Sequence, residues 1–409
     1  MRFPRGLHAL NHRPFRRFFV AQLLSQVGTW MQSVSQAWLV LQLTGSPLKL
    51  GLLGTLQFGP MLVLSVVPGV IADRWSRRRL LIATQGTLAA QAAALAALVA
   101  TGRARYWQVA VLALVTGLAT AIDAPARQSF VMGLVGRADI LNAAALNSAA
   151  FNAARIVGPA VAGVLIARFG VAPAFVINAV GLGVVLLTLL ALPPDAGGRA
   201  AARGSMAAQI GEAVRFARRS PGIVPLLGLL LVVSLCVFNF SVYVPLLART
   251  VLGVGPEGFG FLMAALGVGA VSGALALGTR VSPDPGLRLL FAAAAGACAG
   301  LVLLSASGRI ATAALLLLVT GAAGIVATTG CNTALQLLAP DELRGRIMSL
   351  YTWVYGGAYP IGSFLVGAVS ERYGVAVALR GMGVAGLLLL VAVAASRPER
   401  APVRAVVNR

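Results

Sequence analysis

The chain has 409 residues, of which 58% are hydrophobic and only 11% are charged. This composition is too apolar for a soluble globular protein of this length and indicates an integral membrane protein. The formal net charge of +22 is not evidence for nucleic-acid binding, because the basic residues are spread along the chain rather than gathered in one patch.

Apolar runs of about 20 residues or more recur along the chain, each long enough to cross a hydrocarbon core of about 30 Å as a helix. They show no two-residue alternation, which excludes a barrel and leaves helices as the spanning elements. The first run has no convincing cleavage site after it, so we read it as a retained helix and not as a signal peptide. We therefore predict an all-α polytopic membrane protein with twelve transmembrane helices, near 18–43, 50–72, 80–102, 106–122, 140–167, 169–192, 223–248, 258–278, 289–308, 310–338, 347–370 and 374–395.

The Lys and Arg residues are distributed unevenly between the two sides of this topology. Most of the 33 fall in alternate connections and in the two terminal segments, whereas the other connections hold few. Because positive residues favour the inner side, both termini are expected in the cytoplasm of a bacterial-type inner membrane. The charge thus reflects insertion in a lipid bilayer, and we expect no nucleic-acid partner.

The longest hydrophilic stretch lies in the middle of the chain and divides it. Within it, Met206, Ile210 and Val214 recur at helical spacing, which favours an interfacial amphipathic helix, although a solvated linker helix is the alternative. The predicted organisation is an N-terminal six-helix bundle over 1–192, a cytoplasmic linker over 193–221, and a C-terminal six-helix bundle with a basic tail over 222–409.

The two halves resemble one another in sequence. The stretch GVLIARFGV over 163–171 matches GAVSERYGV over 367–375, and the same offset places Gly69 on Gly273. One constant offset at two places indicates an internal repeat, and hence two pseudo-symmetric bundles.

One charged turn stands between the second and third apolar runs. The stretch 69–79 reads GVIADRWSRRR, with Gly69 four residues before Asp73 and therefore on the same helix face. This pattern resembles the signature loop between helices 2 and 3 of the major facilitator superfamily of transporters. The resemblance implies two six-helix halves with a substrate bound between them near the midplane.

Two further motifs resemble the export branch of that superfamily. The stretch RIVGPAVAG over 155–163 is similar to the Gly-Pro motif of antiporters and contains Gly158, Pro159 and Gly163, and PDELRGRIMS over 340–349 looks like the loop before helix 11 in the enterobactin exporter and macrolide efflux branch. Two departures stand out. The second-half loop, GALALGTR over 273–280, has lost its acid, and helix 4 lacks the mid-span arginine of many proton-coupled antiporters.

Charged residues near the inner helix ends are candidates for a gate. Asp73 and Asp123 are expected at the cytoplasmic ends of helices 2 and 4, where ion pairs with arginines would hold the inner side closed. The alternative is that these arginines only set the topology. The candidate gate residues are Gly69, Asp73, Arg74, Arg77, Arg78, Asp123 and Arg127.

Arg155 is expected about 22 Å along helix 5, close to mid-bilayer. A cation at that depth is costly and usually faces a cavity or a partner. We predict that it attracts an anionic or hydrogen-bond-accepting part of the substrate. The alternative is that Arg155 donates to carbonyls freed by Pro159 and pins a kinked helix.

Polar and aromatic residues at helical spacing extend this candidate cavity. Helix 1 carries a polar stripe, which lines a cavity or bonds neighbouring helices. The tyrosines of helix 11 either contact a bulky substrate or serve as packing and interface residues. The candidate lining residues besides Arg155 are Gln22, Gln26, Thr29, Ser33, Gln36, Asn147, Asn152, Asn332, Gln336, Tyr355 and Tyr359.

Other functional classes have little support in the sequence. There is no Walker-type motif for ATP, and no convergent set of reactive residues for an enzyme. The three cysteines fall in predicted spans, and His8 and His12 have no further ligand nearby in sequence, so we expect neither a metal nor a cofactor.

The leading hypothesis is a monomeric secondary exporter of a small amphipathic or anionic molecule, siderophore-like or drug-like, with protons as a possible coupling ion. No carboxylate is evident within the membrane, and Asp123 is the nearest candidate for a proton carrier. The alternatives are a lysophospholipid or lipid flippase, or a nutrient importer of the same fold.

Overall fold

The computed structural model describes residues 4–64, 76–136, 139–192, 211, 214–218, 220, 222–279 and 286–396. In these residues every regular element is a helix. The elements before the middle of the chain are η1 (Arg5–Asn11), α1 (Arg13–Thr44), α2 (Pro47–Leu64), α4 (Arg77–Ala100), α5 (Tyr106–Leu134), α6 (Ile140–Phe169) and α7 (Ala172–Ala191). Those after it are α9 (Ile223–Val232), η3 (Val233–Val237), α10 (Phe240–Leu246), η4 (Leu247–Val251), α11 (Pro256–Gly278), α12 (Leu287–Leu304), α13 (Ile310–Leu338), α14 (Asp341–Tyr373) and α15 (Val375–Ala395).

Nine of the helical segments in the described residues are long and apolar enough to cross a membrane. One of them, Ile223–Val251, is assembled from α9, η3, α10 and η4. The long helices α1, α2 and α14 are not among the nine, and α1 carries the buried glutamines Gln22, Gln32 and Gln36. The all-helical prediction is confirmed, whereas the count of twelve spans is not.

The helices form two compact units. Unit 1 comprises Met1–Gly45, Gly59–Arg203 and Val254–Ala264, and unit 2 comprises Ser46–Phe58, Gly204–Gly253 and Ala265–Arg409. Two helices are therefore shared, because α2 begins in unit 2 and α11 begins in unit 1.

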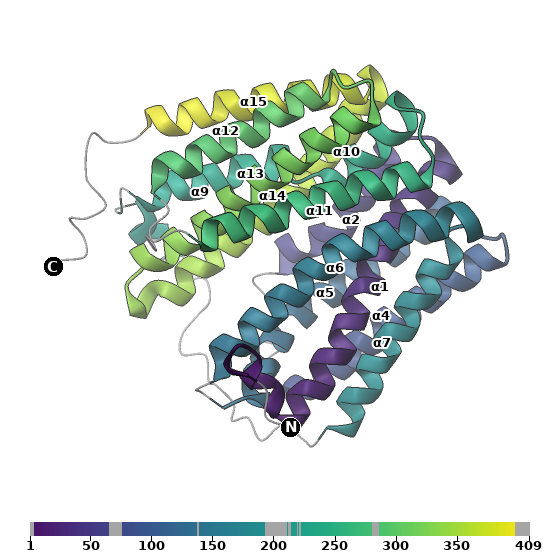
Figure 1. Ribbon diagram of the computed structural model, residues 1–409, viewed down its shortest axis with the longest axis vertical. Coiled ribbons are helices and arrows are strands. Elements are labelled where there is room, and N and C mark those ends of the chain that lie inside the picture. Colours follow the sequence, from purple (N-terminus) through teal and green to yellow (C-terminus); the bar gives the residue numbers. More distant parts are fainter. Residues whose placement is uncertain are drawn as a thin grey trace. The chain divides into compact units, whose positions relative to one another are not determined.

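Unit 1 is built around α1, α4 and α7, which run side by side (Figure 1). At one end of the unit, Phe18 on α1 meets Phe130 on α5 edge to face, with ring centroids 5.6 Å apart. Leu80 and Leu81 on α4 belong to the same buried cluster. Burying a side chain of this size stabilises the fold by about 1.5–3 kcal/mol.

This cluster explains why α5 continues beyond the predicted run, which ends at residue 122. Pro125 lies inside the helix, and the next turns bury Phe130 and Val131 against α1 and α4, so the helix extends to Leu134. The prediction that Asp123 lies at a helix end is therefore wrong, because Asp123 is in the interior of α5.

Unit 2 packs α12 against α13 and α15 (Figure 1). Close helix approach is possible because α15 has glycines at the contact: a Cβ built on Gly386 would lie 2.6 Å from the Cys298 sulfur. The cysteines Cys236, Cys298 and Cys331 are all buried free thiols, as predicted for packing residues.

The predicted continuous helix over 223–248 is interrupted, which is a second correction. The interruption lies at Phe238 and Asn239, whose ψ angles of 7° and 34° are not helical. The segment before it, η3, is a π-helix. The Asn239 side-chain amide donates to the Leu235 carbonyl at 2.7 Å and replaces a main-chain donor there. A polar side chain of this kind stabilises an interrupted helix inside a membrane.

Candidate functional site

The predicted signature loop is only partly within the described residues. Gly69, Asp73 and Arg74 lie outside them, while Arg77 and Arg78 form the first turn of α4 behind the capping residue Ser76. The Arg78 guanidinium donates to the carbonyl oxygens of Leu189 at 2.7 Å and Leu190 at 2.8 Å. Arg78 thereby stabilises the last turn of α7, where unpaired carbonyls favour a cation.

Asp123 and Arg127 form an ion pair within α5, so the structure brings together two of the predicted gate residues. The Asp123 carboxylate is fully buried, and its Oδ1 accepts hydrogen bonds from Thr84 and Gln85 on α4, both at 2.8 Å. Arg127 retains 28% of its side-chain exposure. The charge pair therefore has one buried member and one member within reach of water.

The polar residues of α1 lie in different surroundings. Gln22 and Gln36 are buried inside unit 1, whereas Thr29 donates to Asn178 on α7 at 3.3 Å. Sequence reasoning missed a neighbouring network in which the Asn178 amide donates to Gln32 at 2.8 Å, and the Gln32 amide donates to Gln91 on α4 at 3.2 Å. Uncharged amides inside predicted spans were the available signal for it.

Arg155 is half-buried on α6 and lies over the indole ring of Trp30 on α1, 5.9 Å from the ring centroid. Trp30 also meets Phe151, one turn before Arg155, at 5.7 Å between centroids. A guanidinium held over an aromatic face keeps its positive charge, which attracts anions. Trp30 was not predicted, although it lies one residue after Thr29 of the polar stripe.

The glycine after Arg155 fixes the approach of α6 to α1. A Cβ built on Gly158 would lie 2.5 Å from the Trp30 Cβ and 3.0 Å from the Val27 carbonyl oxygen. Nearby, the Asn152 amide donates to the Ser148 carbonyl of its own helix at 2.9 Å, and Asn147 is half-buried. Gly158 therefore sets the distance between Arg155 and the ring it covers.

Unit 2 contributes an aromatic face built from α14 and the interrupted helix. Tyr351 and Tyr355 stack with centroids 6.0 Å apart, and Tyr355 meets Phe238 at the break edge to face at 5.7 Å. Tyr359 shares a hydrogen bond with Ser241 and packs on Phe58 at 4.5 Å. On α13, the predicted residues Asn332 and Gln336 are joined by a 2.5 Å hydrogen bond.

Paired glycines make two similar helix crossings, one in each unit. In unit 2 a Cβ on Gly51 would lie 2.9 Å from the Gly367 Cα, and in unit 1 a Cβ on Gly163 would lie 2.8 Å from the Gly260 Cα. We call these the α2–α14 seam and the α6–α11 seam. Gly163 and Gly367, one from each seam, occupy equivalent positions in the sequence repeat.

A hydrophilic cap closes the end of the α2–α14 seam. The Glu371 carboxylate on α14 accepts hydrogen bonds from the Ser46 hydroxyl at 2.8 Å and from the Leu48 main-chain amide at 3.1 Å. The carboxylate thus satisfies free donors at the start of α2, where the helix dipole favours a negative charge.

The N-terminal segment is attached to the start of α6 through two histidines. His8 and His12 each donate to a different oxygen of Asp139, both at 2.7 Å. Hydrogen bonds from His12 and then His8 lower the pKa of Asp139 below its ordinary value. Within the described residues, no group of three or more His, Cys, Asp or Glu side chains is arranged to hold a metal.

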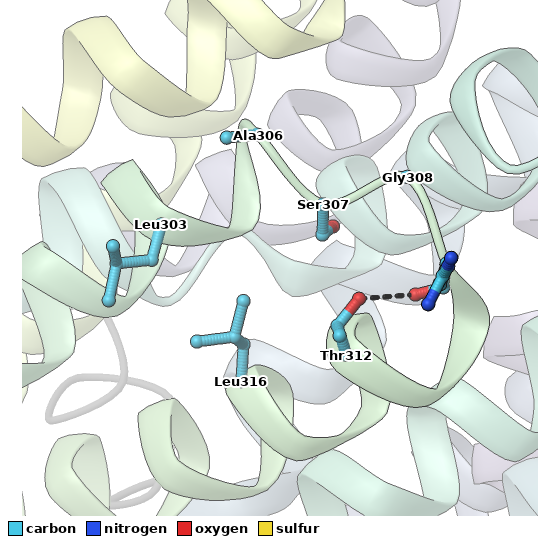
Figure 2. Close-up of a pocket in the computed structure, with 7 residues that line it drawn as sticks. Leu303, Ala306, Ser307, Gly308, Thr312 and Leu316 are labelled. Carbon is cyan, nitrogen blue, oxygen red and sulfur yellow. Dashed lines mark hydrogen bonds between the residues drawn. The ribbon is translucent and has the colours of Figure 1, made fainter.

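A pocket of about 550 Å³ lies at the connection between α12 and α13, away from every predicted lining residue. Figure 2 shows Leu303 and Leu316 on its two sides and the Thr312 hydroxyl donating to the Arg309 carbonyl. The lining is mainly apolar and contains none of the buried polar groups described above. We therefore do not assign the substrate to this pocket.

Comparison with known proteins agrees with this architecture. The family described as transmembrane secretion effector (MFS_3) matches residues 5–406. The enterobactin exporter EntS of Escherichia coli O1:K1 / APEC is 29% identical over 403 residues, covering 96% of this chain and 95% of that protein. The enterobactin exporter EntS of Shigella boydii serotype 18 shows the same identity and coverage.

Solved transporter structures share the fold. The nucleoside transporter NupG (D323A mutant) gives a TM-score of 0.75 at 13% identity, covering 93% of this chain and 99% of that one. The D-xylose-proton symporter gives 0.72 at 14% identity, covering 93% of this chain and 98% of that one. The family match spans nearly the whole chain, so this protein belongs to the transmembrane secretion effector family of the major facilitator superfamily and is a multi-pass membrane transporter, not an enzyme.

Proposed function

We propose that the protein is a secondary exporter of a small amphipathic or anionic molecule, siderophore-like or drug-like, from the cytoplasm across the inner membrane. The observation that carries this proposal is the Arg155 guanidinium, half-buried in the middle of α6 and held over Trp30. A cation at that depth is costly unless it serves a partner or a ligand. The enterobactin exporters to which the chain is similar support the export direction.

The proposed mechanism is alternating access by two six-helix halves, in a monomer with both termini in the cytoplasm. The α2–α14 and α6–α11 seams support this mechanism, because the helices meet through glycines. They can therefore separate without first disengaging interlocked side chains. The Asp123–Arg127 pair is the proposed inner gate, since breaking it would leave the buried Asp123 carboxylate without its charge partner, which makes opening a discrete step. Protons are the proposed coupling ion.

The test is transport by inside-out vesicles containing the protein, with labelled enterobactin as the first probe. Accumulation that does not require ATP and collapses with a protonophore is expected. Arg155→Gln should weaken apparent affinity by about 10-fold to 150-fold, because a charge-assisted hydrogen bond contributes about 1.5–3 kcal/mol. Arg168→Gln, at the last turn of the same helix, is the matched control and should retain transport.

Other results would contradict parts of this proposal. Accumulation in right-side-out vesicles would indicate an importer, and movement of a labelled lysophospholipid between leaflets would indicate a flippase. Equal transport by Arg155→Gln and Arg168→Gln would remove Arg155 from the site. If Arg155→Gln no longer bound neutral substrates but still bound anionic ones, the anion-binding role would be contradicted.

A further inference from the structure

Asp123 is an acid in an unusual position. Among the acids whose side chains the structure describes, Asp139, Glu257 and Glu371 lie within a turn of a helix end, whereas Asp123 is in the interior of α5 and 0% exposed. It lies about 25 Å along the helix from Tyr106, which places it near the inner margin of a hydrocarbon core of about 30 Å.

The hydrogen bonds around Asp123 are fitted to its charged form. Thr84 and Gln85 both donate to Oδ1, and the Arg127 guanidinium pairs with Oδ2. The Gln85 amide, however, uses only its nitrogen, because its buried Oε1 has no hydrogen-bond partner. A buried acceptor without a donor costs about 1–3 kcal/mol, so the site is incompletely satisfied in this state.

Further unpaired acceptors lie on the neighbouring helix. The side-chain oxygens of Gln22 and Gln26 on α1 are buried without a partner. Phe18 on α1 contacts Phe130 on α5, and the two helices run antiparallel. About two helical turns beyond this contact, Gln22 and Gln26 on α1 therefore lie at about the level of Asp123 on α5. These oxygens lie at about the level of the carboxylate and have no hydrogen-bond partner of their own.

We propose that Asp123 is the proton-binding site of this transporter, and that Gln85 and Arg127 switch partners when the proton binds. The proton adds to the carboxylate and gives the neutral acid, so the net charge of the pair rises from zero to plus one. The Gln85 amide turns over and its Oε1 accepts the new carboxyl proton. Arg127, which already has 28% of its side chain exposed, moves into water as its buried partner loses its charge.

In the described residues, the other charged side chains on the helices packed against α5 are arginines. On α1 they are Arg13, Arg16 and Arg17, and on α4 they are Arg77, Arg78 and Arg79, with Arg78 bound to the end of α7. On α6 they are Arg155, over Trp30, and Arg168. Arginine stays protonated at any physiological pH, which leaves Asp123 as the group that changes charge in this set.

This inference rests on the proposed coupling to protons, but it can be tested without any transported substrate. Purified protein in liposomes is adsorbed to a solid-supported membrane and stepped from about pH 8 to about pH 5, a range that covers most carboxyl titrations. Protonation of a buried group displaces charge and gives a transient current. The wild type is expected to give this current, and Asp123→Asn is expected to lose it.

Two further variants keep the result decisive. Asp139→Asn removes a carboxylate from the end of α6 and should leave the current unchanged. Asp123→Glu retains the titratable group in a slightly different place and should keep the current with a shifted pH midpoint. This second variant decides the matter when Asp123→Asn does not fold.

An unchanged current in Asp123→Asn, or an unchanged midpoint in a folded Asp123→Glu, would overturn the proposal. Failure of the exporter proposal looks different: the wild type would show the pH-step current yet accumulate no enterobactin in inside-out vesicles. If the wild type gave no pH-step current but still accumulated enterobactin, proton binding at Asp123 would be refuted and the exporter proposal would stand.

Discussion

Replacing Gly51 with alanine should loosen the α2–α14 seam. The added Cβ would lie 2.5 Å from the Ser363 carbonyl oxygen and 2.9 Å from the Gly367 Cα, whereas ordinary contact begins at 3.4 Å. Both neighbours are main-chain atoms, which cannot rotate away as a side chain can. The two helices must therefore separate by several tenths of an ångström or more.

The size of the effect follows from the cost of overpacking, which is about 1–3 kcal/mol. Because Gly51→Ala destabilises only the closed seam, the population with the seam open should rise by about 5-fold to 150-fold. Ser363 is 0% exposed beside Gly51, so a cysteine placed there reports this population. The three native cysteines are buried, which keeps the background low.

The assay is the rate at which a membrane-impermeant maleimide labels Ser363→Cys in intact cells, with and without Gly51→Ala. Gly59→Ala is the matched control, because a Cβ on Gly59, in the same helix, would meet nothing within 4 Å. Faster labelling is expected with Gly51→Ala alone. Equal rates with Gly51→Ala and Gly59→Ala would refute the inference that the seam depends on the absence of a side chain.

Two other predictions concern stability. Hydrogen bonds from His12 and His8 lower the pKa of Asp139, so its ionised form stabilises the fold above the ordinary carboxyl pKa, and this contribution disappears as the pH falls through the lowered value. The thermal unfolding temperature of the purified protein should therefore decrease more steeply on acidification in the wild type than in Asp139→Asn. Equal decreases in the two proteins would contradict this. Phe130→Ala should destabilise the protein by about 3–5 kcal/mol in the same assay, whereas Leu141→Ala, 85% exposed, should have little effect; similar losses would show that the cluster around Phe18 is not a packed core.

The features that depend on local composition were predictable from the sequence. Helices of membrane-spanning length and buried cysteines follow from apolar runs, and the Asp123–Arg127 pair follows from i,i+4 spacing. The repeat of Gly163 at Gly367 indicated equivalent positions before any contact was known. These signals lie in one segment of chain or in two matching segments.

The features that depend on packing between distant helices were not predictable. The extension of α5 beyond Asp123 is stabilised by Phe18 and Leu81 on other helices, and no pattern within α5 announces it. Trp30 became part of the Arg155 environment only because Gly158 lets α6 approach α1. The interruption at Asn239 was hidden because an apolar run reads the same whether its backbone is continuous or broken.

Because of that interruption, the residues allowed at positions 239 and 362 depend on each other, although the two positions are far apart in the chain. Any side chain at 362 would collide with the Leu235 carbonyl at 2.2 Å and with the Asn239 amide at 2.5 Å. A larger residue at position 362 therefore requires a continuous helix through 238–239 and a smaller residue than asparagine at position 239. Among natural relatives of this transporter, asparagine at the one position and glycine at the other should be inherited or lost together.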